Sequence, residues 1–347
     1  MSLLLDLALR LVLLACSLWG GLALLHRFPA GISLRRLSAL AWVLLGGLCL
    51  VWHWQGARLG PTLVMAVSMA LLLCWWRRLA PASDLAWADD VAYLATGHRQ
   101  GERLVLDHVR CFDWLSRDQA KVAWERREYD LRRLASLDLF VSGWGRPGIA
   151  HVLLSFGFAD EQGRIDDFVA FSAEVRRERD EPFSEIGGFF KRFELAIIAA
   201  DERDAVRLRS NVRGETVTLY RVLLGQHERR ELLLALVEQA NRLKREPRFY
   251  HTITANCTTL VYALMRRIIE GLPLDHRLLL SGLLPGYVHD HGGLVPGFPL
   301  NELKRCGNIT RRAVAAHDDP DFSRRIRQGV PGWEASALQP EEVNASQ

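Results

Sequence analysis

The sequence lacks the cysteine patterns of disulfide-rich and zinc-binding proteins. No C-x-x-C pair occurs, and three of the six cysteines lie in apolar runs, namely Cys16, Cys49 and Cys74. The other three, an odd number, cannot all pair, so neither a disulfide scaffold nor a zinc knuckle is indicated. A bridge between Cys111 and Cys306 stays open, with Cys257 as the third cysteine.

A strong charge of one sign and the common phosphate, serine and zinc motifs are absent as well. The 44 basic residues are mixed with 40 acidic ones, and the formal net charge of +4 gives nucleic-acid binding no support. There is no G-x-S-x-G, H-E-x-x-H or G-x-x-x-x-G-K. These absences count against a serine hydrolase, a zinc protease and a nucleotide-driven enzyme, and we predict no cofactor and no metal.

Three long apolar runs occupy the first part of the chain, at residues 3–25, 37–54 and 61–76. Each is near the length that crosses a bilayer, at about 1.5 Å of rise per residue. A signal peptide is the alternative for the first run, but the start of that run carries Asp6 rather than a basic cluster, and two similar runs follow. We therefore expect residues 1–79 to form a multi-pass membrane segment with three transmembrane helices.

The arginines around these runs favour a cytoplasmic location for the rest of the chain. Three lie between the first and second runs, one lies between the second and third, and two follow the third: Arg27, Arg35 and Arg36, then Arg58, then Arg77 and Arg78.

A charged and mixed composition begins near residue 80 and indicates an α+β domain over residues 80–334, before a polar tail at 335–347 that we expect to be disordered. Alternation predicts strands at 104–106, 137–141, 151–158, 168–175, 195–200 and 217–222, most of them in one antiparallel sheet. The third and fourth of these form a hairpin across a polar turn. An amphipathic helix is predicted at 231–244, and the chain past Gly271 is loop-rich.

Cys257 stands where an apolar helix begins. Asn256, Thr258 and Thr259 suit a helix cap, and apolar residues then recur at helical spacing up to Gly271. A thiol in the first turn faces unpaired backbone N–H groups and the positive end of the helix dipole, which favour the thiolate. Cys257 is therefore a candidate nucleophile, although a buried cysteine beside a cap is the plainer interpretation.

A cysteine nucleophile needs a base and a group that orients the base. His151 is the best base, because it opens a strand directly after a Gly/Pro-rich bend. Glu174 is the first carboxylate on the partner strand and lies close to opposite His151 if the turn is centred near Gly163. Asp167 is the alternative, since pairing parity is not fixed by sequence.

Other histidines are weaker candidates. His251, six residues before Cys257, is the second choice as base. His289 and His291 would share a face in a strand and could hold a metal, but no third ligand is evident and a surface turn explains them better.

Many short blocks in order resemble the Lnb-type family, named for its N-terminal periplasmic domain. The blocks run from about Trp87 to Gly332: Tyr129-Asp130-Leu131, Leu139-Phe140-Val141-Ser142, Ala150-His151, Leu154-Ser155-Phe156-Gly157-Phe158, Ala170-Phe171-Ser172, Ala200-Asp201-Glu202-Arg203-Asp204, Phe249-Tyr250, Asn256-Cys257-Thr258-Thr259, Leu284-Pro285-Gly286-Tyr287, Asp321-Phe322-Ser323 and Ile326-Arg327. The family resembles circularly permuted papain-like thiol enzymes of the NlpC type, in which the histidine strand precedes the cysteine helix. The resemblance implies catalytic roles for Cys257, His151 and Glu174.

The resemblance also implies an activity and a location. A characterised member of the family transfers an acyl chain to the N-terminal amine of bacterial lipoproteins. We therefore expect a thiol acyltransferase in the bacterial inner membrane, with a phospholipid donor, an amine acceptor and a catalytic domain in the periplasm, against the arginine count. Two alternatives stay open: a cysteine peptidase or amidase acting on cell-wall peptide, and an inactive papain-like module that binds a lipid or protein.

Overall fold

The computed structural model describes residues 2–82, 84–146 and 148–333, and these residues form two compact units. The first unit comprises Met1–Ala82, Pro182–Glu194 and Arg248–Thr252, and the second comprises the remaining described residues. The predicted tail at 335–347 lies outside the described residues.

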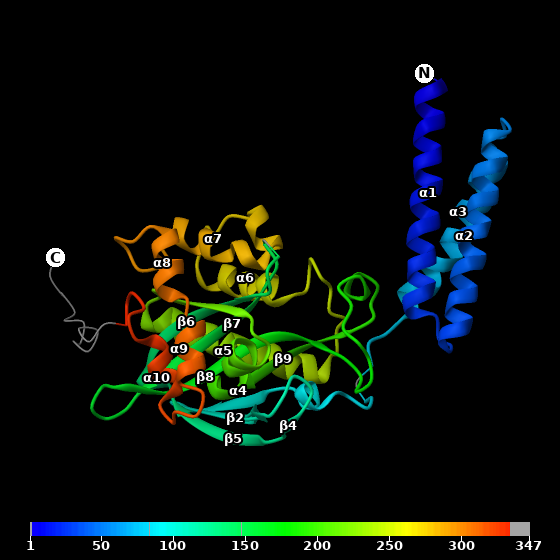
Figure 1. Ribbon diagram of the computed structural model, residues 1–347. Helices are drawn as coiled ribbons and strands as arrows, with labels where there is room; N and C mark the ends of the chain where they lie inside the picture. The colour runs from blue at the N-terminus through cyan, green and yellow to red at the C-terminus, as the bar shows by residue number, and fades with distance from the viewer. Residues whose placement is uncertain (1, 83, 147, 334–347) are drawn as a thin grey trace. The chain divides into compact units, whose positions relative to one another are not determined.

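The first unit contains the three predicted apolar helices, which are α1 (Ser2–Arg27), α2 (Ile32–Trp54) and α3 (Leu59–Arg78) (Figure 1). All three are long and apolar enough to cross a membrane. Small residues let α1 and α2 approach closely, since a Cβ on Gly46 would overlap the Ser17 side chain. The indole of Trp42 donates a hydrogen bond to the Cys16 carbonyl, 3.2 Å away, and so joins the same two helices. The prediction of three apolar helices is thus confirmed.

The second unit is built on one mixed but mostly antiparallel sheet. Its order is β1 (Thr96–Gln100), β2 (Arg103–Arg110), β9 (Glu194–Ala200), β8 (Ile165–Arg176), β7 (Ala150–Ala159), β6 (Leu134–Gly143) and β10 (Thr216–Arg221), and β5 (Trp124–Asp130) also pairs with β2. β2 and β9 are parallel, whereas the other recorded pairings within this sheet are antiparallel. A separate two-stranded sheet joins β3 (Asp113–Trp114) to β4 (Ala120–Lys121). The α+β class and the hairpin between β7 and β8 are confirmed.

Helices cover this sheet. The longest in the unit, α5 (Gln226–Arg245), packs against β1 and β6, and α6 (Cys257–Ile268) packs against β7 and β8. α4 (Glu202–Arg207) and α10 (Phe322–Arg327) also contact β8. The largest fully buried side chains of the sheet are phenylalanines, Phe140, Phe156 and Phe171, each of which stabilises the fold by about 1.5–3 kcal/mol when buried.

A buried ion network ties α4 and α10 to the sheet. The Arg327 guanidinium donates to Asp138 on β6 at 2.8 Å and to Glu202 on α4 at 2.6 Å. Glu202 also accepts from the Ser155 hydroxyl on β7, at 2.5 Å. Because the charges are paired and hydrogen-bonded, they can lie in the interior, and they fix the helices on that face.

The loop-rich chain past Gly271 also contains short helices that the sequence did not indicate: α7 (Leu284–Asp290), α8 (Leu300–Gly307) and α9 (Thr310–Ala315), before α10. These helices have six to eight residues, too few for a clear helical period. Cys111 and Cys306 are both free thiols, so the bridge between them is not formed.

Candidate active site

The start of α6 holds Cys257 in a fully capped first turn. The Asn256 side chain accepts hydrogen bonds from the backbone N–H groups of Thr258 and Thr259, both at 2.9 Å. In return the Thr259 hydroxyl accepts from the Asn256 backbone N–H at 3.0 Å, which completes a capping box. Cys257 is the first residue of the helix, at the positive end of its dipole.

The Cys257 thiol is buried but surrounded by donors. Its side chain contacts that of Ser281, with 3.6 Å between Sγ and Oγ, and Ser281 in turn accepts from the Thr258 hydroxyl at 2.7 Å. Burial opposes the thiolate, but the hydrogen bond and charge of His151, together with Ser281 and the Val152 backbone N–H, outweigh it and lower the pKa of Cys257. The site therefore favours a thiolate.

His151 lies near the start of β7, between the cysteine and a carboxylate. Its Nε2 atom is 3.1 Å from Oε1 of Glu174, although the two are not aligned as a regular hydrogen bond. Burial disfavours the imidazolium, but the negative charge of Glu174 and the nearby Cys257 side chain outweigh burial and raise the pKa of His151 to about 9. A raised histidine pKa and a lowered cysteine pKa both shift the pair towards its thiolate–imidazolium form.

Glu174 reaches His151 because of the hairpin register. Leu154 pairs with Phe171, and the same register continued towards the strand ends brings Glu174 opposite His151. Burial disfavours its charge, but His151, Arg209 and Ser172 outweigh burial and hold its pKa well below the usual range. Glu174 therefore stays ionised behind the histidine.

Arg209 is a functional candidate that the sequence analysis missed. Its Nη2 atom is 2.8 Å from Oε1 of Glu174, and its Nη1 donates to the Ala205 carbonyl at 2.7 Å. Arg209 belongs to a five-residue π-helix, Leu208–Val212, that follows α4, and such bulges are frequent at functional sites. Ser172, which the sequence analysis saw only as part of a family block, donates to the same carboxylate oxygen at 2.6 Å. Arg209 and Ser172 position Glu174, and no sequence signal points to this arginine.

The alternative residues have other surroundings. Asp167 pairs with Phe158, at the far end of the hairpin from His151, so it cannot orient that histidine. His251 belongs to the first unit, where its ring contacts Phe189 edge to face, at 5.6 Å between centroids.

The His289 and His291 pair does not form a metal site. His289 contacts Asp290 and the Phe298 carbonyl, and His291 contacts the Tyr287 carbonyl. Within the described residues, no group of three or more His, Cys, Asp or Glu side chains is arranged to hold a metal ion.

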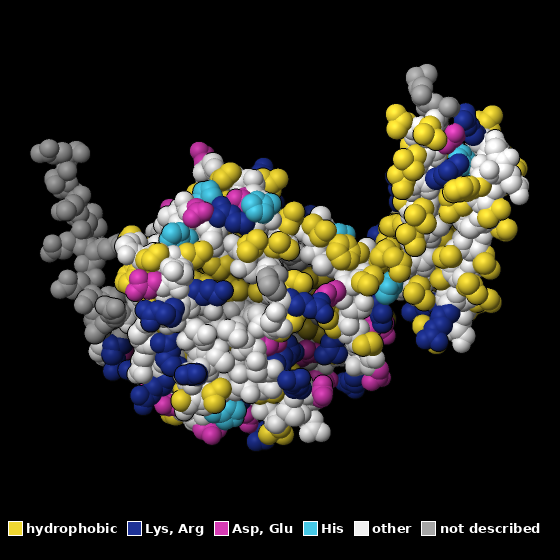
Figure 2. All heavy atoms as spheres, turned by 45° about the horizontal axis from the view of Figure 1, so that its top comes forward, with side chains coloured by type: hydrophobic (Ala, Val, Ile, Leu, Met, Phe, Trp, Pro, Cys, Tyr) yellow, Lys and Arg dark blue, Asp and Glu magenta, His cyan; other side chains and the backbone are white. Residues whose placement is uncertain are grey.

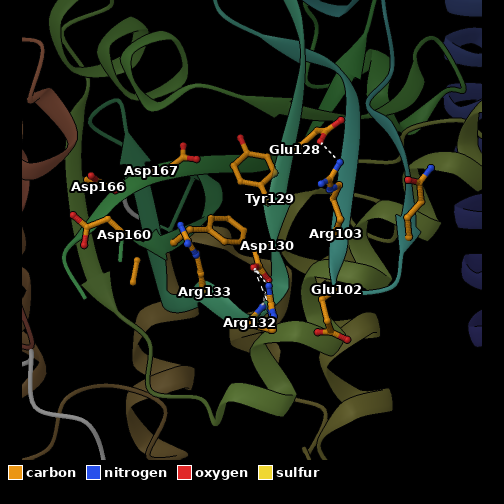
Figure 3. A pocket seen from close by; sticks show the side chains of 13 residues that line it. Glu102, Arg103, Glu128, Tyr129, Asp130, Arg132, Arg133, Asp160, Asp166 and Asp167 are labelled. Atoms are coloured by element: carbon orange, nitrogen blue, oxygen red, sulfur yellow. Dashed lines mark hydrogen bonds and ion pairs between the residues drawn. The ribbon is translucent and has the colours of Figure 1, made fainter. Parts of the chain in front are cut away.

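An open pocket of about 670 Å³ lies at the other end of the hairpin from His151 (Figure 3). Its lining mixes acidic side chains, including Asp160 and Asp167, with basic ones, including Arg103 and Arg132. Many of these charges pair with one another, as Arg132 does with Asp130 at 2.6 Å. None of Cys257, His151 and Glu174 lines this pocket.

The second unit thus brings together a cysteine at a helix start, a histidine at a strand start and a partly buried carboxylate, which is the arrangement of a thiol-dependent site. The model of the family described as the Lnb N-terminal periplasmic domain matches residues 120–282, a stretch that contains all three side chains. This match supports the resemblance to the Lnb-type family over residues 120–282. No curated protein and no solved structure matches the chain. The family and the apolar helices indicate a membrane-associated periplasmic protein.

Proposed function

We propose that the protein is a membrane-anchored thiol acyltransferase, which moves an acyl chain from a phospholipid through a Cys257 thioester to an amine such as a lipoprotein N-terminus. The proposal is carried by the arrangement in which His151 lowers the pKa of Cys257 while Glu174 lies 3.1 Å from that histidine. A cysteine of lowered pKa beside a histidine of raised pKa can act as the nucleophile of an acyl transfer.

Two steps account for the reaction. The Cys257 thiolate attacks the ester carbonyl of the phospholipid, the S–C bond forms as the ester C–O bond breaks, and His151 gives its proton to the departing lysophospholipid oxygen. An amine then attacks the thioester, the C–N bond forms as the C–S bond breaks, and His151 takes the proton from the amine nitrogen. Glu174 orients His151, and the backbone N–H of Cys257 suits the oxyanion.

Exposed apolar side chains beside the thiol support a lipid donor. Leu279, Leu280 and Leu283 flank Ser281, which contacts Cys257, and Leu279 is 50% exposed. Exposing a fatty acyl chain to water costs about 0.8 kcal/mol of free energy per CH₂. Apolar side chains beside the thiol would therefore stabilise the bound acyl chain of a lipid donor. The three apolar helices of the same chain would keep the site near a bilayer.

The proposal includes a fold relationship and a location. The order of a histidine strand before a cysteine helix supports a circularly permuted papain-like arrangement. The periplasmic description of the family supports a multi-pass protein of the bacterial inner membrane, with its catalytic domain in the periplasm.

Intact-mass analysis of the detergent-purified full chain mixed with phospholipid tests the function. We expect a fatty-acyl increment on the peptide that contains Cys257, which hydroxylamine removes because it cleaves thioesters. Cys257→Ala should carry no adduct, and Cys257→Ser should carry a slowly resolving ester. Cys306→Ala, the matched control at another free thiol, should acylate like the wild type.

Two outcomes would contradict the proposal. Cys257-dependent cleavage of a cell-wall peptide without an acyl adduct would identify a peptidase or amidase. No adduct, no cleavage and no labelling of Cys257 by a thiol-reactive activity probe would identify an inactive binding module.

A further inference from the structure

A loop of the chain packs with the membrane helices around one buried aromatic ring. Phe190 belongs to the segment Pro182–Glu194 of the first unit. Its ring stacks on His26 at 5.6 Å and contacts Trp19 and Trp76, each at 6.3 Å between centroids. His26 and Trp76 lie in the last turns of α1 and α3, so the loop is held at the ends of two membrane helices.

Two cations meet over a neighbouring ring in the same unit. The Lys191 ammonium lies 5.4 Å from the Phe249 ring centre, and the Arg27 guanidinium lies 5.1 Å from it. Lys191 also donates to the Trp76 carbonyl at 2.8 Å and lies 5.1 Å from the Trp76 ring centre. We call Arg27, Lys191, Trp76 and Phe249 the cation–aromatic cluster.

The positive charges of the cluster are not neutralised by carboxylates of the described residues. Among the described residues, no carboxylate forms an ion pair with Arg27 or Lys191. Lys191 uses one of its three donors on Trp76, and the Arg27 guanidinium donates none of its five to a described residue. Two like charges therefore sit together with most of their donors free, which is unfavourable unless an anion joins them.

The backbone at Lys191 is held in an uncommon conformation. Its φ of 52° lies in the left-handed region, which is uncommon for residues other than glycine. Such conformations cost about 1–3 kcal/mol and persist where the surroundings impose them, often at ligand sites. Here the conformation presents the ammonium to Trp76 and Phe249.

The loop also exposes apolar side chains of the type that lie at a membrane surface. Phe183 is 55% exposed, Ile186 is 54% exposed and Phe189 is 38% exposed. Tryptophan and other amphipathic rings gather at headgroup level, and Trp75 and Trp76 are in the last turn of α3. If α3 crosses a bilayer, the cations of the cluster would lie at the level of the lipid phosphates.

We propose that the cation–aromatic cluster binds the phosphate of a phospholipid headgroup. The site deepens the proposed function, on which it rests for the identity of its ligand as the acyl donor. Phe249 is eight residues before Cys257 in the chain, so one short segment connects the phosphate site to the nucleophile. In many membrane proteins, Lys and Arg at helix ends mark the cytoplasmic side. A bound phosphate would give Arg27 a different role, as a lipid ligand.

Native mass spectrometry of the full chain in mild detergent tests the site, with phosphatidylglycerol as the probe and Cys257→Ala as the background. No thioester can form there, so lipid binding is measured apart from catalysis. Removal of each cation, by Arg27→Gln or Lys191→Gly, should weaken retention of the lipid about fivefold. Glycine suits the positive φ at residue 191, so Lys191→Gly keeps the backbone while it removes the ammonium.

Controls separate this site from general charge effects. Lys244→Gln and Lys304→Gln remove exposed lysines of the second unit, and both should retain lipid like the background protein. Lys191→Arg should also retain it. Inorganic phosphate at the concentration of the lipid should displace none.

Three results would overturn the inference: equal retention after the cluster variants, equal loss after the control variants, or displacement by inorganic phosphate, which would indicate a site for a free anion. Lipid retention in Cys257→Ala with no acyl adduct in the wild type would leave the phosphate site standing and contradict the acyltransferase.

Discussion

At the scale of single residues, two cysteines of this chain show how surroundings decide reactivity. Burial raises the pKa of Cys111 to about 12, because the carboxylates of Asp201 and Glu125 act with burial and against Arg127. Cys257 is also buried, yet His151 supplies a hydrogen bond and a positive charge, and its pKa is lowered. The raised pKa makes the Cys111 thiol a poor nucleophile, whereas the lowered pKa activates the Cys257 thiol.

Iodoacetamide should therefore label Cys257 at least about tenfold faster than Cys111 near pH 7. The signs are fixed by the shifts: the thiolate is present above the lowered pKa of Cys257, and the imidazolium that stabilises it persists until pH rises through about 9. His151→Phe removes that cation and should slow the labelling of Cys257 at neutral pH. The measurement is peptide mass spectrometry over a pH series, and equal rates for the two cysteines at every pH would rule out Cys257 as the activated thiol.

Part of this site could be predicted at residue scale. Strand periodicity and one polar turn bring His151 opposite Glu174, and cap residues identify the helix start at Cys257. Arg209 could not be predicted, because a π-helix breaks the local period that sequence patterns follow. Whether the predicted catalytic roles are correct stays a prediction that the labelling and acylation experiments address.

At the scale of elements, the start of α6 joins stability to chemistry. Asn256→Ala removes the acceptor for two backbone N–H groups and should destabilise the helix start by about 1 kcal/mol. A looser first turn presents a weaker dipole to Cys257, so its alkylation near pH 6 should slow. Asn256→Ser, which still caps, is the matched variant and should stay near the wild-type rate. Thermal melting and alkylation measured together would contradict this link if stability fell while alkylation did not change.

The interior ion pairs of short helices could not be predicted from sequence patterns. Glu202 and Arg327 each belong to one of the sequence blocks that resemble the family. In the structure these two side chains form an ion pair in the interior. Asp204, in the same block as Glu202, pairs with Arg110 on β2 at 2.7 Å. Contacts between residues so far apart in sequence depend on tertiary packing, so the local periodicity of the sequence does not predict them.

At the scale of the whole molecule, orientation in the membrane sets two arguments against each other. The periplasmic family domain predicts that the second unit lies outside the cytoplasm. The arginine count predicts the reverse. Five arginines lie on the side of the membrane where the domain follows α3 and only Arg58 lies on the other side; the five are Arg27, Arg35, Arg36, Arg77 and Arg78. A phosphate ligand at Arg27 and Lys191 would reconcile these two predictions. Cations that bind a lipid headgroup can lie on either side of the membrane, so Arg27 would not then indicate the cytoplasmic side.

Reporter fusions decide the orientation. With three membrane-spanning helices and a periplasmic domain, alkaline phosphatase should be active when fused after Gln347 or after Gly31, in the connection between α1 and α2. It should be inactive after Gly56, in the connection between α2 and α3, where a fluorescent protein should instead fold and emit. The Gly56 fusion is the internal control, because its result must be opposite to that of the other two if all three helices cross. A fluorescent, phosphatase-inactive fusion at Gln347 would show that the arginines set the topology, and it would remove the periplasmic lipoprotein acceptor from the proposed reaction.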